Sequence, residues 1–146
     1  PVWLTLDHSA AKIIGCDGYN ICVWNLADGQ KLNRIQIQDH AFAFAYSPQT
    51  GLAAVRDAGT VALWTLIGSE ICERVHVPPG PALLSFDQSG EKFAYCAGDE
   101  VVVRNLDGES THLDCSGVPR LVSFSFAPNG DLWTGHADGK VRRWTP

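Results

Sequence analysis

Hydrophobic and polar positions alternate with a period of two in the clearest stretches of the chain. In residues 41–46, aromatic side chains at 42, 44 and 46 alternate with alanine. A period of two is typical of a β-strand, whereas an α-helix repeats every 3.6 residues. Further β-rich runs follow, separated by turn-forming Pro, Gly and Asp: residues 52–56, 61–66 and 71–77. No amphipathic helix of useful length occurs, so the pattern predicts an all-β protein.

The same pattern recurs every 40 residues. Trp24, Trp64 and Trp144 stand 40 and 80 residues apart, and Arg104 occupies the place where a fourth Trp is due. Three other series keep this step without a gap: Leu4, Phe44, Leu84 and Phe124; Leu6, Tyr46, Phe86 and Phe126; Ile21, Val61, Val101 and Val141. The spacing predicts one domain made of four copies of a four-stranded unit, with approximate bounds 1–39, 40–79, 80–117 and 118–146.

Four short antiparallel strands in about 40–45 residues, repeated, are the sequence signature of a β-propeller blade. Large residues in each first strand stand beside small ones, which suits tapered sheets stacked around an axis: Leu4 and Thr5, Phe44 and Ala45, Leu84 and Ser85, Phe124 and Ser125. We therefore assign the aromatic residues of the repeats to core packing. The fourth unit ends after its third strand, so we expect an open edge along 140–144 and two uncovered blade faces.

The residues around the periodic Trp resemble those of WD-repeat β-propellers. The resemblance covers nearly the whole chain and rests on four strand ends and one turn: Val23-Trp24-Asn25-Leu26, Leu63-Trp64-Thr65-Leu66, Val103-Arg104-Asn105-Leu106, Arg143-Trp144-Thr145-Pro146 and Ser125-Phe126-Ala127-Pro128-Asn129-Gly130. The Asp that follows Trp in the family is replaced in every repeat. The resemblance therefore implies the fold, but not the family's buried Asp–His–Ser–Trp hydrogen-bond network.

Composition narrows the class of protein further. The 146 residues carry a net charge of −5, and an acidic chain lacks the clustered cations that bind nucleic acid, so we do not expect a nucleic-acid partner. The longest apolar run has six residues, far fewer than the roughly 20 of a membrane-spanning helix. We also find no signal peptide. The chain begins at Pro1 and contains no Met, and we interpret it as a piece of a longer protein.

The cysteines and histidines do not form a metal or disulfide pattern. Five cysteines without a CxxC pair favour buried, reduced thiols and a cytoplasmic location: Cys16, Cys22, Cys72, Cys96 and Cys115. Five histidines lack the close spacing of zinc ligands: His8, His40, His76, His112 and His136. No motif for a catalytic nucleophile, a nucleotide or a metal hydrolase occurs. We predict no enzyme activity, no metal and no cofactor.

The loops of a propeller gather on one face, and binding residues concentrate on loops carried by a rigid scaffold. We place there the stretches between second and third strands and between successive repeats. Tyr and Arg are enriched at binding hot spots, and His and Glu are our second choice. The candidate partner-binding residues are Tyr19, His40, Arg56, Glu100, Arg120 and His136.

Two functions remain open from the sequence. The first is a non-catalytic scaffold that binds a protein or peptide, as a segment of a larger regulatory or sensor protein. The alternative is an assembly element that completes a larger ring, for example an eight-bladed one, by pairing with other blades or with a second copy of the chain.

Overall fold

The computed structural model describes residues 3–7 and 11–146 and contains four antiparallel sheets, which we call blades one to four. Blade one consists of β1 (Trp3–Asp7), β2 (Lys12–Cys16), β3 (Asn20–Asn25) and β4 (Lys31–Gln36). Blade two consists of β5 (Ala43–Ser47), β6 (Leu52–Arg56), β7 (Thr60–Thr65) and β8 (Glu70–His76). Blade three consists of β9 (Leu84–Phe86), β10 (Lys92–Ala97), β11 (Glu100–Asn105) and β12 (Ser110–Asp114). Blade four consists of β13 (Leu121–Phe126), β14 (Leu132–His136) and β15 (Val141–Trp144).

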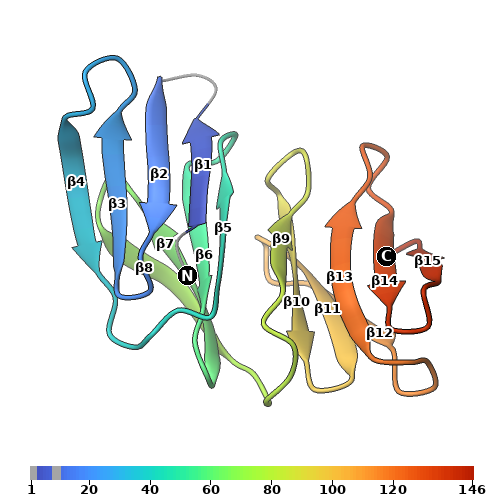
Figure 1. Ribbon diagram of the computed structural model, residues 1–146. Helices are drawn as coiled ribbons and strands as arrows, with labels where there is room; N and C mark the ends of the chain where they lie inside the picture. Colours follow the sequence, from blue (N-terminus) through green and yellow to red (C-terminus); the bar gives the residue numbers. More distant parts are fainter. Residues whose placement is uncertain (1–2, 8–10) are drawn as a thin grey trace.

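Within each blade, strands that are consecutive in the sequence are neighbours in the sheet, because short turns can join antiparallel strands directly. The blades follow one another in chain order, from blue to red in Figure 1, and β5 and β9 of neighbouring blades lie side by side. The described residues contain no helix, so none is long and apolar enough to cross a membrane. The predicted all-β architecture is confirmed, including a last blade with no outer strand among the described residues.

The hydrophobic core lies between the blades rather than within one of them. Alternate side chains of a strand point to opposite faces, so each inner blade packs against two neighbours. Ile14 and Ile21 of blade one pack against Phe44 and Trp64 of blade two. The second layer, between blades two and three, is built around Val61, Leu63, Phe93 and Tyr95. The third, between blades three and four, is built around Ala94, Val101, Val103 and Leu132.

The 40-residue spacing fails in one strand. Tyr46 pairs with Ala53 in blade two, but the corresponding Phe126 pairs with Leu132, one residue earlier than the spacing predicts. The preceding turn is one residue shorter, closed by a hydrogen bond of 2.8 Å from the Ala127 N–H to the Asp131 carbonyl. A shift of one residue in a strand exchanges its two faces. Leu132 is therefore buried, and our assignment of the aromatic residues to the core is wrong for Trp133, which is 42% exposed.

Arg104 differs from the Trp residues at the equivalent positions of the other repeats in its contacts as well as in its residue type. Arg104 extends from β11 to Glu73 on β8 of blade two, where its Nε donates a hydrogen bond of 2.9 Å and its Nη2 forms an ion pair. Its other terminal nitrogen donates to the Gly108 carbonyl and the Ser110 hydroxyl. The hydrogen bond and the charge of Glu73 raise the pKa of the Arg104 guanidinium. A polar bridge thus replaces the expected Trp between blades two and three.

A chain of hydrogen bonds braces blade four. Trp144 Nε1 donates to Thr134 Oγ1 over 2.8 Å, and Thr134 Oγ1 lies 2.8 Å from His136 Nε2. His136 Nδ1 donates to the Pro119 carbonyl over 2.8 Å, so its Nε2 is free to accept the Thr134 hydroxyl proton. Thr134 and His136 are both buried. Blade four therefore contains a Trp–Thr–His hydrogen-bond chain that joins β15 and β14 to the loop after β12.

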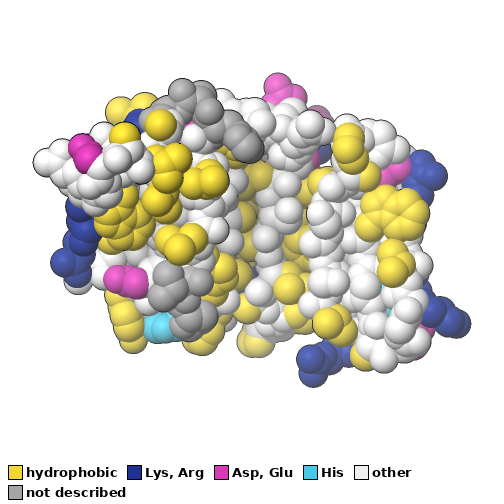
Figure 2. Space-filling model, turned by 45° about the horizontal axis from the view of Figure 1, so that its top comes forward, with side chains coloured by type: hydrophobic (Ala, Val, Ile, Leu, Met, Phe, Trp, Pro, Cys, Tyr) yellow, Lys and Arg dark blue, Asp and Glu magenta, His cyan; other side chains and the backbone are white. Residues whose placement is uncertain are grey.

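The outward faces of blades one and four carry exposed hydrophobic side chains. Blade one presents Leu4 and Leu6, 67% and 52% exposed. Blade four presents Trp133 and Val141, the latter 64% exposed. Figure 2 shows hydrophobic side chains gathered at the blade one end, with others at the blade four end. These faces are equivalent to those that form the three buried layers, because the repeats share one strand order.

Candidate functional site

The loops that join second to third strands, and those that join successive blades, lie along one edge of the molecule, the lower edge in Figure 1. We call this edge the loop face. It is formed by residues 17–19, 37–42, 57–59, 77–83, 98–99, 115–120 and 137–140. The six predicted binding residues lie on this face or at the strand ends beside it, but the structure does not bring them together: they form two pairs, and Arg56 and His136 lie apart.

Glu100 and Arg120 line a pocket of about 670 Å³ on the loop face, between blades three and four. The pocket lies where the loop after β8, the β10–β11 turn and the loop after β12 meet. Its wall includes Pro81, Ala82, Leu83, Gly98, Asp99, Cys115, Ser116, Val118, Leu121 and Val122. Among the predicted binding residues, these two are the ones that the structure places in a cavity large enough for part of a peptide.

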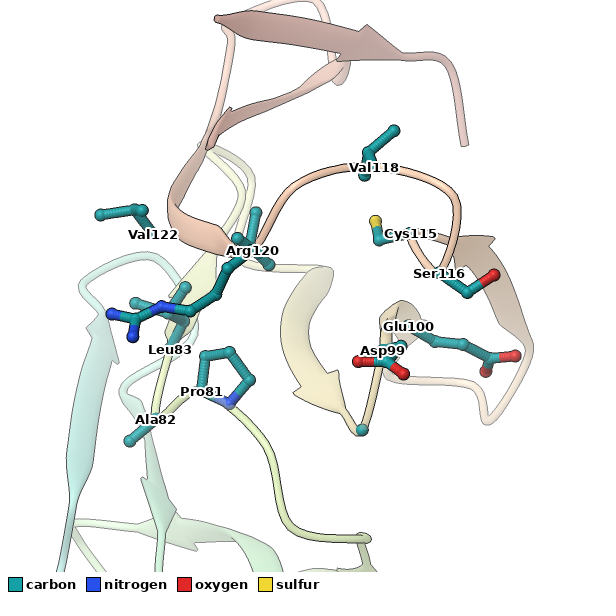
Figure 3. A pocket seen from close by; sticks show the side chains of 12 residues that line it. Pro81, Ala82, Leu83, Asp99, Glu100, Cys115, Ser116, Val118, Arg120 and Val122 are labelled. Atoms are coloured by element: carbon teal, nitrogen blue, oxygen red, sulfur yellow. The ribbon is translucent and has the colours of Figure 1, made fainter. Parts of the chain in front are cut away.

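The charged groups of the pocket stand on opposite sides. Figure 3 shows the Arg120 side chain beyond Leu83 and Pro81, and the Asp99 and Glu100 carboxylates across the pocket from it. Glu100 Oε2 lies 2.9 Å from His112 Nδ1 on β12, at an exposed position. Within the described part of the chain, the side chains of Asp99 and Arg120 form no hydrogen bond or ion pair. Both are exposed and available to a ligand.

Apolar groups lie between these charges. Leu121 and Cys115 are buried, and Leu83 and Val118 pack against the core layer between blades three and four. Burial raises the pKa of the Cys115 thiol, so the thiol stays protonated at neutral pH and is a poor nucleophile. The pocket therefore offers an apolar floor with a carboxylate at one side and a guanidinium at the other.

The rim of the pocket is held by close backbone packing. A Cβ at Gly80 would lie 2.9 Å from the Gly98 carbonyl oxygen and 3.0 Å from the Gly98 nitrogen, so only glycine fits there. Gly98 has a φ of 63°, a left-handed conformation that also favours glycine. Pro78, Pro79 and Pro81 further restrict the loop that Gly80 belongs to. This loop is thereby fixed against the β10–β11 turn.

Arg56 is buried and does not lie in an exposed loop, so its assignment as a contact residue is wrong. It ends β6, is 2% exposed, and donates hydrogen bonds to the carbonyl oxygens of Cys96 and Pro78, the latter over 3.3 Å. Burial lowers the pKa of its guanidinium. The strand continues to residue 56 and directs this side chain toward blade three. Arg56 thus ties the loop after β8 to β10.

His136 is likewise not exposed. It ends β14, is 5% exposed, and belongs to the hydrogen-bond chain with Thr134 and Trp144. His136 is the last residue of β14, so it belongs to the sheet and not to the turn that follows. His8 lies outside the described residues.

Tyr19 and His40 form a separate aromatic cluster with Phe42, between blades one and two. The Tyr19 and His40 rings meet edge to face with centroids 4.9 Å apart, and His40 and Phe42 are 5.3 Å apart. Tyr19 and Phe42 are 56% and 51% exposed. Phe42 was missed, because its place in an alternating apolar run indicated a strand. The apolar floor residues Leu83 and Val118 were also missed, since nothing in the local pattern separates them from core positions.

The comparisons with known proteins support the fold. The structure resembles the β-propeller domain of Cps50 (Swd1) from Myceliophteria thermophila, with a TM-score of 0.78 and 12% identity over 96% of this chain. It also resembles hydrazine synthase from Kuenenia stuttgartiensis, with a TM-score of 0.75 and 13% identity over 96% of this chain. The chain spans 50% of the first protein and 44% of the second. No family model matches the sequence, and the comparison with curated proteins gives no match.

Proposed function

We propose that this chain is a non-catalytic interaction module that binds a protein segment in the pocket between blades three and four. The observation that carries the proposal is the cavity of about 670 Å³ on the loop face, lined by two of the six residues selected from the sequence. It combines a fixed rim, an apolar floor and two unpaired charges, which is the composition expected of a site for a polar and apolar peptide. The pattern of Trp-centred repeats and the Trp144–Thr134–His136 chain support a WD-repeat type of propeller.

The chemistry of the pocket favours binding over catalysis. Its thiol is kept protonated by burial, and its Glu100 is engaged by His112. Catalysis by acid and base would need a nucleophile or substrate position between two poised groups, and the pocket offers no such pair among its described residues. The proposed partners are proteins or peptides in the cytoplasm. The described residues also contain no group of three or more potential metal ligands.

Filling the pocket tests the proposal. Peptides selected from a random eight-residue display library on the full chain should bind Ala82→Trp less tightly, because Ala82 is an exposed residue of the pocket lining and an indole there adds bulk at the rim. The matched control is Ala27→Trp, an exposed position in the β3–β4 turn at the opposite edge. Selected peptides that bind Ala82→Trp as well as the native chain would contradict the proposal.

A second candidate function is assembly of a larger ring. The exposed faces of blades one and four favour it, as does the edge of β15, which pairs with no strand among the described residues. This chain spans 50% of the Cps50 propeller chain, which agrees with a molecule that forms about half of a ring. Further blades, in the same polypeptide or in a second copy, would cover these faces. This assembly role and peptide binding are compatible, because they use different surfaces.

A further inference from the structure

We infer that the pocket between blades three and four selects peptide segments that carry a cationic side chain and, a few residues away, a carboxylate. The inference rests on the proposed function and names the ligand chemistry of the same site. Asp99 is the anchor for the cation and Arg120 is the anchor for the carboxylate. Neither side chain has a partner within the described residues, although both line the same cavity.

The separation of the two anchors is the first argument. Asp99 and Arg120 are more than 4.0 Å apart, since no ion pair joins them, and Figure 3 places the guanidinium beyond Leu83 and Pro81, away from the carboxylate. They therefore do not neutralise each other. A ligand that covers the apolar floor removes water from both, and an unpaired charge pays a large desolvation penalty. Only a ligand with opposite charges at a matching distance compensates at both sides.

The rigidity of the site is the second argument. The Gly80–Gly98 contact fixes the proline-rich loop against the turn that carries Asp99. Arg56 ties the same loop to β10 through the Pro78 and Cys96 carbonyls. The backbone that carries Asp99 is therefore held in place before binding, and a preorganised site loses less conformational entropy on binding. The two charges also fix the orientation of a bound peptide, because its cation must lie toward blade three and its carboxylate toward the loop that leads into blade four.

Other charges around the pocket do not reproduce this arrangement. Glu100 adds negative charge to the Asp99 side but is engaged by His112 over 2.9 Å. Asp114 is exposed, and its hydrogen bonds from Ser116 lower its pKa, so it also favours a cation on the blade three side. The cation end of the ligand is therefore the more strongly attracted one. We expect Lys or Arg to be the more constant feature of bound peptides.

The test uses the full chain and a random eight-residue peptide display library. Selection on the native chain should enrich peptides with Lys or Arg and, at a constant spacing, Asp or Glu. Asp99→Asn should lower the affinity for a selected peptide by about tenfold, as expected for loss of a hydrogen bond to a charged group. Arg120→Gln should lower it by a similar factor. Asp39→Asn and Arg74→Gln are the controls, because both residues are exposed and lie outside this pocket.

Exchange of the two charges gives the sharper result. Selection on the double variant Asp99→Lys with Arg120→Glu should enrich peptides with the same spacing but the reverse order of charges. Peptides that still lose binding to Ala82→Trp but show no charge pattern would overturn this inference and leave the proposed function standing. Selection that yields no peptide sensitive to Ala82→Trp would contradict the proposed function itself.

Discussion

Two arginines show how single side chains join blades in this protein. Arg56 is buried and bonds two backbone carbonyls of the next blade or the loop before it, without a carboxylate partner. Arg104 reaches in the opposite direction, to Glu73 of the preceding blade. A buried or half-buried guanidinium is tolerated where its donors are satisfied, since an unsatisfied one would carry the full desolvation cost. Both residues therefore replace hydrophobic contacts between blades two and three with directed polar ones.

Arg104→Trp restores the periodic residue and tests whether position 104 still accepts it. Trp cannot pair with Glu73, and this carboxylate would lie half-buried without its partner. We expect a loss of about 1–2 kcal/mol in the free energy of unfolding, measured by urea denaturation. Glu73→Gln should reduce the cost of the Arg104 change in a double-mutant cycle. A more stable Arg104→Trp variant would show that the polar bridge contributes little.

The cysteines differ in their expected reactivity. Cys72 is exposed on β8, contrary to the prediction of a buried thiol, whereas the other four are buried. Burial raises the pKa of Cys96 to about 12 and raises those of Cys16 and Cys115. Because the thiolate is the reactive form, iodoacetamide at pH 7.5 should label one thiol per folded chain rapidly, as measured by mass spectrometry. Cys72→Ser should remove this fast phase, and fast labelling of Cys96 would contradict the burial.

At the scale of the strand, the hydrophobic spacing predicted most of the fold. It located the first and third strands of all four blades, because the periodic side chains on those strands face a neighbouring blade or, in β1 and β15, an uncovered end face. It failed for β14, since the length of a turn is set by its backbone hydrogen bonds and not by the hydrophobic pattern beside it. A one-residue difference was enough to place Leu132 in the core and Trp133 on the outward face of blade four.

Substitution of Trp64 and of Trp133 by Ala tests the shifted register of β14. Trp64 is 8% exposed within the layer between blades one and two, so Trp64→Ala should leave a cavity and destabilise the chain by about 3–5 kcal/mol. Trp133 is 42% exposed, and Trp133→Ala should cost less than about 1 kcal/mol. Chemical denaturation of both variants, at a protein concentration low enough to keep the chain monomeric, measures the contrast. Equal losses would contradict the assigned register of β14.

The hydrogen-bond chain of blade four gives a second test at this scale. Thr134→Val keeps the volume but leaves the Trp144 N–H and the His136 ring nitrogen without their partner. We expect a loss of about 1–3 kcal/mol in the free energy of unfolding. Thr134→Ser retains the hydroxyl and should therefore keep most of the stability that the Val variant loses. A Val variant as stable as the native chain, measured by thermal unfolding, would show that the chain does not brace the blade.

At the scale of the molecule, the sequence predicted the loop face but not the pocket. The repeat identified which loops meet at one edge, and it selected Glu100 and Arg120 from them. It could not group the candidates, because the pocket arises from the packing of blade three against blade four and its floor is made of residues that look like core. Arg56 and His136 are the last residues of β6 and β14, and both are buried rather than exposed on the loop face.

The central claim is that this chain is a partial propeller whose two end faces are interaction surfaces. Multi-angle light scattering of the 146-residue chain tests it most directly. We predict dimers or larger assemblies, and a shift toward the 15.8 kDa monomer in Trp133→Glu, which places a charge on the blade four end face. Ile67→Glu, at a 99% exposed position away from that face, should leave the native distribution unchanged. A monodisperse native monomer of 15.8 kDa that unfolds cooperatively would contradict the claim.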